Sequence, residues 1–151
     1  MSGSFYFDDE WNILQNSALQ INELSPRSIE HAASSGASGP LGRPIAMASF
    51  AVNYFLSGFD PFYFKITNLI IHLLTGLGVY VLAMGLARLV SNINAKQAEY
   101  LALLTAAFWL LHPLNLTPVL YVVQRMTSLS ALFVFWGLVA YVFGRIRLNA
   151  G

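Results

Sequence analysis

The sequence predicts an all-α fold, a polytopic bundle of membrane-spanning helices preceded by an acidic amino-terminal segment. Hydrophobic residues make up 56% of the 151 residues and charged residues only 10%, against roughly 25% charged in an ordinary soluble domain. Three long uncharged runs lie between residues 66 and 144. Six of the seven acidic residues precede these runs, and six of the eight basic residues lie from Lys65 onward. Together these observations favour a membrane protein over a water-soluble globule.

The charge pattern and the absence of cysteine exclude several classes of protein. Up to Asp60 the chain has six acidic and two basic side chains, and beyond it one acidic and six basic side chains. The net charge is only +1, so the composition indicates no nucleic-acid partner. With no cysteine, disulfides and thiolate metal sites are excluded. The partner that the composition indicates is the lipid bilayer.

The first predicted domain, residues 1–61, is an external segment that ends in an interfacial helix. Its Gly, Ser and Pro residues at 34–44 predict a flexible connection. Residues 45–56 follow with the spacing of a helix that has one apolar stripe, too short to span a bilayer comfortably. The aromatic residues at 59–64 are typical of the headgroup region.

The second predicted domain, residues 62–151, contains all three uncharged runs. A helix needs about 20 apolar residues to cross a bilayer, so residues 66–87 and 127–144 each predict a spanning helix.

The middle run contains two prolines, and proline removes a backbone donor and clashes with the preceding helical turn. We therefore predict a short helix over 100–112, a break, and a second short piece over 118–123. The break should lie at a membrane surface or inside protein, because irregular backbone in lipid is costly.

The orientation follows from four basic residues that flank the predicted spans on one side. Positively charged loops stay in the cytoplasm, which predicts that residues 1–61 and 113–126 lie on the outer, periplasmic or lumenal, side. Arg125 is the exception within that outer loop. The four basic residues are Arg88, Lys96, Arg145 and Arg147.

Asp8, Asp9 and Glu10 form the densest charge in the chain, with aromatic residues on both sides. Adjacent carboxylates can raise one another's proton affinity, hold a divalent metal through oxygen ligands, or act as a general base. The alternative interpretation is a solvated acidic tail.

A second set of candidates lies on the first predicted span. Lys65, Asn68, His72 and Thr75 are spaced by three, four and three residues, which places them on one face of a helix. Ionisable groups within a membrane normally face a bundle interior or a cavity, so His72 is a candidate site residue. The alternative is a structural hydrogen bond between helices.

The outer connection adds three further candidates. Gln124 and Arg125 stand just before the last span, and an arginine there is suited to a phosphate, which it can hold by forked hydrogen bonds. Snorkelling toward lipid headgroups is the alternative for Arg125. His112 is either a phosphate or base partner or a helix-terminating residue. The chain has no P-loop, dinucleotide fingerprint or HExxH motif, so nucleotide-driven transport and zinc proteolysis lack support.

Five short motifs follow one another in order over nearly the whole chain. Read together, they resemble the amino-terminal part of GT-C membrane glycosyltransferases, especially the branch with tetratricopeptide repeats that includes transmembrane O-mannosyltransferases and bacterial relatives. The motifs are Phe7 to Ile13, Gly42-Arg43-Pro44 leading to Asn53-Tyr54-Phe55, Phe64 to Leu74, Leu111 to Leu114, and Val123-Gln124-Arg125.

The resemblance implies a polyprenyl-phosphate sugar as donor, a protein or glycan hydroxyl as acceptor, and chemistry on the outer face. It makes Asp8 and Asp9 the candidate catalytic bases and Arg125 the first candidate for the lipid phosphate. Some enzymes of this superfamily use a divalent metal and others do not, so a metal at Asp8, Asp9 and Glu10 stays open. The remaining candidates for the donor are Arg43, His72, His112 and Gln124.

The resemblance also implies parts that this sequence lacks. A spanning helix should precede the acidic loop, and further helices with a repeat domain should follow it. We therefore expect a partial GT-C-like chain that needs missing helices or a partner subunit for turnover, in a bacterial inner membrane. The alternative is a small non-catalytic membrane scaffold or assembly partner, and a transporter fragment is a third interpretation.

Overall fold

The computed structural model describes residues 5, 8–37, 42–90 and 93–150. In these residues every element of regular secondary structure is a helix or a helical turn. The predicted all-α fold class is confirmed. Phe7 of the acidic motif and residues 38–41 of the predicted flexible connection lie outside the described residues. The chain forms two compact units, each described separately below. Unit 1 comprises Met1–Asn68 and Pro118–Met126, and unit 2 comprises Leu69–Thr117 and Thr127–Gly151.

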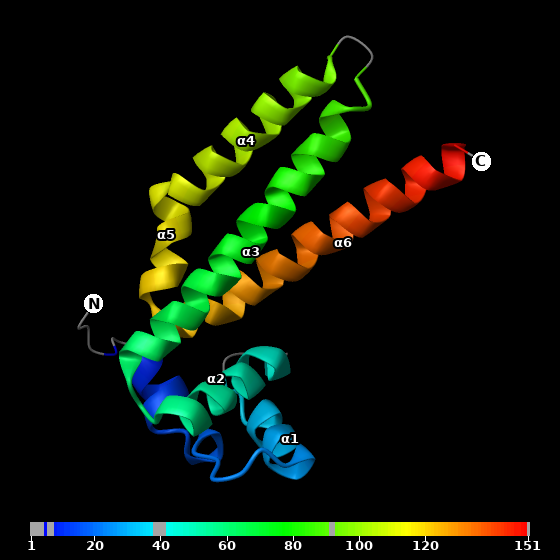
Figure 1. Cartoon of the computed structure of the whole chain (residues 1–151). Helices are drawn as coiled ribbons and strands as arrows, with labels where there is room; N and C mark the ends of the chain where they lie inside the picture. Colours follow the sequence, from blue (N-terminus) through cyan, green and yellow to red (C-terminus); the bar gives the residue numbers. More distant parts are fainter. Residues whose placement is uncertain (1–4, 6–7, 38–41, 91–92, 151) are drawn as a thin grey trace. The chain divides into compact units, whose positions relative to one another are not determined.

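Unit 1 is built from short helices whose ends are set by local sequence signals. The π-helical turn η1 (Glu10–Leu14) and the 3-10 turn η2 (Ser17–Leu19) lead into α1 (Pro26–Ser34). Ser25 caps α1, since its hydroxyl accepts a hydrogen bond from the Ser28 backbone at 3.2 Å. Helix α1 packs against α2 (Pro44–Ser57), as Figure 1 shows. The fully buried core side chains of this unit include Ile13, Leu19, Met47 and Phe50.

Helix α2 is the helix predicted at residues 45–56, and a left-handed turn precedes it. Gly42 and Arg43 both have positive φ, 57° and 48°, and such a conformation is strained for arginine but not for glycine. Pro44 then occupies the first helical position, where its fixed φ suits the helix and its missing N–H has no consequence. The sequence Gly42-Arg43-Pro44 thus determines where α2 begins.

Helix α3 (Pro61–Ala87) starts five residues earlier than the predicted span at 66–87. The reason is a cap, because Asp60 Oδ1 accepts a hydrogen bond from the Phe62 backbone at 2.9 Å. Three of the aromatic residues expected before the span, Phe62, Tyr63 and Phe64, therefore lie in its first turns. Helix α3 is long and apolar enough to cross a membrane.

In unit 2 the middle run is broken as its prolines predict. Helix α4 (Ala95–Leu111) starts with a capping box between Asn94 and Gln97 and ends at His112. Helix α5 (Pro113–Leu120) follows with a bend of 54°. The second piece starts at Pro113 and not at the predicted residue 118, because proline is well suited to the first turn of a helix. If the bent pair counts as one span, it is a third candidate span.

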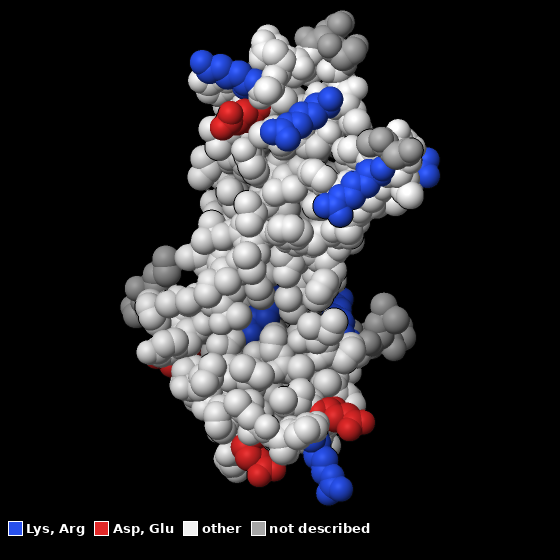
Figure 2. Space-filling view, turned by 45° about the vertical axis from the view of Figure 1, so that its right-hand side comes forward, with Lys and Arg blue, Asp and Glu red and all other residues white. Residues whose placement is uncertain are grey.

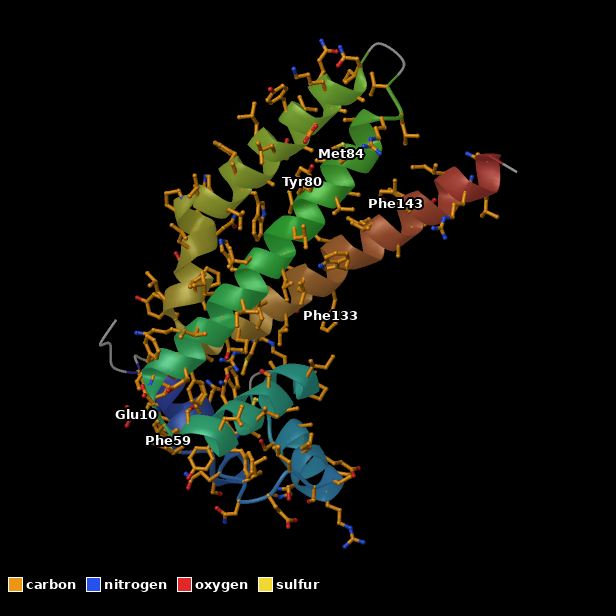
Figure 3. All side chains as sticks on the ribbon, in the orientation of Figure 1. Glu10, Phe59, Tyr80, Met84, Phe133 and Phe143 are labelled. Atoms are coloured by element: carbon orange, nitrogen blue, oxygen red, sulfur yellow. The ribbon has the colours of Figure 1, made fainter. Side chains whose placement is uncertain are left out.

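Helix α6 (Arg125–Ala150) forms most of the other candidate span, Val122–Asn149, and packs on α3 at two glycines of α3. A Cβ on Gly78 would lie 3.3 Å from Trp136 Nε1, and one on Gly85 would lie 3.2 Å from the Phe143 ring. Small residues let two helices approach closely in a membrane. Figure 3 shows Phe143 on the side of α6 that faces α3 and Phe133 on the opposite side.

The charged residues of unit 2 gather at one end of its helices. This end holds the carboxyl ends of α3 and α6 and the amino end of α4, as Figure 1 shows. Figure 2 shows the blue side chains there above a long uncharged surface. The charged residues of unit 2 are Arg88, Lys96, Glu99, Arg145 and Arg147.

The α3–α4 contact provides a test of the packing in unit 2. A Cβ on Gly76 would collide with the Leu110 side chain, so Gly76→Val should destabilise the protein by about 1–3 kcal/mol through overpacking. Gly137→Val is the matched control, since a Cβ there meets nothing within 4 Å. Thermal unfolding in detergent measures both variants, and equal midpoints would contradict the contact.

Candidate active site

The centre of unit 1 is the buried side chain of Arg125. It is 0% exposed, and its guanidinium donates hydrogen bonds to acceptors on two helices, α2 and α3. Nε donates to Asn68 Oδ1 at 2.7 Å, and Nη2 donates to the Phe64 carbonyl at 2.9 Å. Nη1 donates to the carbonyl and the hydroxyl of Ser49, at 3.2 and 3.3 Å. The guanidinium therefore joins α2, α3 and the start of α6.

Two aromatic rings complete the surroundings of this guanidinium. Its central carbon lies 4.6 Å from the Phe50 ring centre and 5.5 Å from that of Phe64. All the acceptors named above are neutral, so hydrogen bonds and ring faces offset the cost of burying the charge. Arg125 neither snorkels to a surface nor presents an open fork to a phosphate.

Asn68 extends the same network to the segment before Arg125. Its side chain is 0% exposed, and its Nδ2 donates to the Pro118 and Tyr121 carbonyls at 3.1 and 3.2 Å. A longer contact of 3.5 Å reaches the Val122 carbonyl. A single amide therefore binds both the Arg125 side chain and the backbone that leads to it.

The three acidic side chains lie in different surroundings. Asp9 is 1% exposed, and its Oδ1 accepts a hydrogen bond from the Val123 backbone at 2.7 Å. Asp8 is exposed. Glu10 is also exposed, and its carboxylate accepts a bond from Gln15 at 3.3 Å. Of the two predicted base candidates, Asp8 is thus open to solvent and Asp9 is buried.

The Asp9 bond brings together two motifs that lie 114 positions apart. Val123 stands directly before the half-buried Gln124 and the buried Arg125. Arg43 lies near the same segment, because its Nη1 contacts Met126 Sδ at 3.2 Å. Unit 1 therefore unites the acidic motif with three of the predicted donor-binding residues.

The other two predicted residues, His72 and His112, lie in unit 2. His72 is buried, and its ring stacks on the Trp109 ring. The distance between His72 Nε2 and the Leu110 carbonyl oxygen is 3.1 Å. His112 ends α4, and its Nδ1 accepts a hydrogen bond from the Leu114 backbone at 3.3 Å. Both histidines make contacts that join or terminate helices.

The sequence pattern does not indicate which groups surround Arg125. Two of its acceptors are backbone carbonyls, which any residue supplies. The signal that could have located Phe50 is the apolar stripe of α2, on which this ring lies. One turn further along α2, the buried Oδ1 of Asn53 has no hydrogen-bond partner among the described residues.

The acidic segment does not form a closed metal site. Across the described residues, no three His, Asp or Glu side chains gather closely enough to hold a metal ion. Asp9 Oδ1 is already engaged by a backbone N–H. The described residues of this segment therefore form no metal cage made of protein ligands alone.

The fold and the site define a helical membrane protein in which a buried arginine network holds an acidic segment. The predicted resemblance to transmembrane O-mannosyltransferases is confirmed. The chain is similar to protein O-mannosyl-transferase TMTC4 of Homo sapiens, with 31% identity over 92% of this chain and 20% of that protein. It is also similar to protein O-mannosyl-transferase TMTC1 of Mus musculus, with 28% identity over 93% of this chain and 15% of that protein. The chain thus spans a fifth or less of the length of these relatives. No family model and no solved structure matches it.

The arginine network predicts a large loss of stability when Arg125 is removed. Arg125→Met leaves the buried Oδ1 of Asn68 without its Arg125 donor and removes the bonds to Ser49 and Phe64, so it should lower the free energy of unfolding by at least about 2 kcal/mol. Arg125→Lys should also destabilise the protein, since an ammonium lacks the planar fork.

Arg27→Met is the matched control, because Arg27 is exposed on α1 and such changes stay within about 0.5 kcal/mol. Thermal or denaturant unfolding in detergent compares the variants. If Arg125→Met were as stable as Arg27→Met, the network would not support unit 1.

Proposed function

We propose that this chain is the part of a membrane glycosyltransferase, of GT-C type, that supplies the acidic base. It would transfer a sugar, mannose by analogy with the relatives' names, from a polyprenyl-phosphate donor to a protein hydroxyl. The similarity to O-mannosyl-transferases over most of the chain supports this assignment. The observation that carries it is the Asp9–Val123 hydrogen bond, which holds the acidic segment beside the Gln124-Arg125 motif.

In this proposal Asp8 is the catalytic base and Asp9 is a positioning residue. The exposed Asp8 carboxylate takes the proton of the acceptor hydroxyl. The hydroxyl oxygen then bonds to the anomeric carbon of the donor sugar, while the bond from that carbon to the phosphate oxygen breaks. The polyprenyl phosphate departs with the electron pair. Asp9 keeps Asp8 in place through its own buried bond.

Arg43 is the residue that we assign to the lipid phosphate. Its side chain is exposed, whereas the guanidinium of Arg125 is buried and its donors are engaged. Arg43 stands directly before the amino end of α2. An anion bound there would accept hydrogen bonds from the guanidinium and would also be stabilised by the positive end of the helix dipole. Arg125 then acts on the reaction only through the fold.

We further propose that residues 1–61 and 113–126 lie on the outer side of a bacterial inner membrane. The support is the collection of basic side chains at one end of unit 2, which the positive-inside rule assigns to the cytoplasm. The two candidate spans and the bent helix pair are long enough for this topology. The acidic segment would then meet a lipid-linked sugar at the outer surface.

The division of roles between the two aspartates is tested in a chimera of human TMTC4 that carries this chain in place of its similar segment. Asp8→Asn should lower mannose transfer at least about 100-fold, the lower end of general-base contributions, with unchanged thermal stability. Asp9→Asn should instead lower the free energy of unfolding by about 1–3 kcal/mol, since a buried carboxylate acceptor is weakened.

Glu10→Gln is the control for charge in the same segment, because Glu10 is exposed, and it should transfer mannose at the rate of the parent chimera. Full transfer by Asp8→Asn would remove the catalytic assignment and favour a non-catalytic scaffold.

The assignment of Arg43 predicts weaker donor binding by one variant of the chain itself. In nanodiscs, Arg43→Gln should bind polyprenyl-phosphate mannose about tenfold less tightly, since one charge-assisted contact is lost. Glutamine keeps a long polar side chain at the same left-handed backbone position. Arg27→Gln, also exposed in unit 1, should bind as the unchanged chain does. Equal affinities for the two variants would contradict the assignment.

A further inference from the structure

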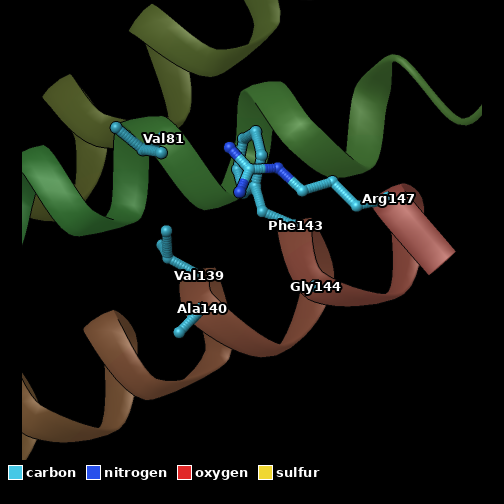
Figure 4. A pocket seen from close by; sticks show the side chains of 6 residues that line it. All are labelled: Val81, Val139, Ala140, Phe143, Gly144 and Arg147. Carbon is cyan, nitrogen blue, oxygen red and sulfur yellow. The ribbon is translucent and has the colours of Figure 1, made fainter.

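A groove of about 440 Å³ lies between α3 and α6 in unit 2. This volume falls within the range of about 300–1,000 Å³ that is usual for ligand pockets. Five of its six lining residues are apolar or small, and the sixth is an arginine, as Figure 4 shows. The lining residues are Val81, Val139, Ala140, Phe143, Gly144 and Arg147.

The groove exists because the two helices touch unevenly. Phe143 packs against Gly85 of α3, at 3.2 Å from the position of a Cβ there, and so forms one wall. On α6, Ala140 and Gly144 provide almost no side-chain bulk, and a Cβ at Gly144 would meet nothing within 4 Å. Small residues therefore leave open a space that Leu or Phe would fill.

Arg147 closes the groove at the charged end of unit 2. It lies near the carboxyl end of α6, and its side chain points back into the groove. Arginine near the end of a spanning helix reaches the level of lipid headgroups. Three further basic side chains and one acidic side chain share this unit, so the local charge is positive.

We propose that this groove binds one anionic phospholipid, and this inference is independent of the proposed glycosyltransferase function. Both helices are long and apolar enough to cross a bilayer, so a hydrocarbon chain is the natural occupant of an apolar hollow between them. A guanidinium at the end of such a hollow suits a lipid phosphate, and the surrounding positive charge selects a net anionic headgroup. The acyl chain lies along Val139 and Gly144, and the phosphate binds Arg147.

Native mass spectrometry of the whole chain in detergent tests this site. The probes are phosphatidylglycerol, phosphatidylcholine with the same acyl chains, and a polyprenyl phosphate. We expect one phosphatidylglycerol to bind in preference to the other two lipids. Arg147→Gln should weaken that binding about fivefold, and Gly144→Leu, which fills the groove, should abolish it.

Two matched controls separate the site from general effects. Gly137→Leu adds the same side chain at another open position of α6, and Lys96→Gln removes a charge that does not line the groove. Both should bind phosphatidylglycerol as the unchanged chain does, and circular dichroism checks the fold of each variant. Equal losses in a variant and its control would overturn the site. Equal binding of phosphatidylcholine, or preference for polyprenyl phosphate, would overturn the proposed occupant.

Discussion

The burial of the Arg125 guanidinium is the interaction on which the rest of unit 1 depends. Burying a charged group away from water costs free energy unless the group is hydrogen-bonded and nearby dipoles or ring faces partly offset its charge. Here the acceptors are the Asn68 amide, the Ser49 hydroxyl and backbone carbonyls, with aromatic rings above and beside. Each of them must stay in position for the charge to remain satisfied. The network therefore fixes α2 and the first turns of α3 around the segment 118–126.

This constraint passes to the acidic segment through one backbone group. Because the Asn68 and Arg125 side chains hold the residues on both sides of Val123, its N–H is fixed where Asp9 accepts it. The neighbouring Asp8 then remains exposed. Two adjacent carboxylates with the same chemistry thus have different environments: Asp9 is buried in a hydrogen bond to the backbone, and Asp8 is accessible to a substrate. The proposed division between a positioning residue and a base follows from this difference in burial.

Much of the fold could be predicted from the sequence because hydrophobicity and proline act locally. The uncharged runs predict the spans, and the two prolines predict the break after α4. The earlier start of α3 depends on the Asp60 cap, and the earlier start of α5 on Pro113 itself, since proline opens a helix as well as ending one. Helix α1 was not predicted, because its nine residues carry few apolar side chains.

The candidate site was harder to predict, since it depends on contacts between distant segments. Motif order identified Asp8, Asp9 and Arg125, but sequence could not show that Asp9 and Arg125 are buried. The burial of Arg125 arises from backbone carbonyls and from Phe50 and Phe64, which look like ordinary apolar residues in the sequence. The two histidines look like site residues in the sequence, whereas their contacts are helix packing and helix termination.

We propose that the acidic segment and its arginine network work at the outer surface of the membrane. Since the chain has no cysteine, single-cysteine variants labelled with a membrane-impermeant maleimide test it directly. Glu23→Cys, in unit 1, should be labelled in intact cells whose outer envelope is opened. Lys96→Cys, in the first turn of α4, should be labelled only after the membrane is permeabilised. The reverse pattern, or equal labelling of both variants before permeabilisation, would contradict this orientation of the chain in the membrane.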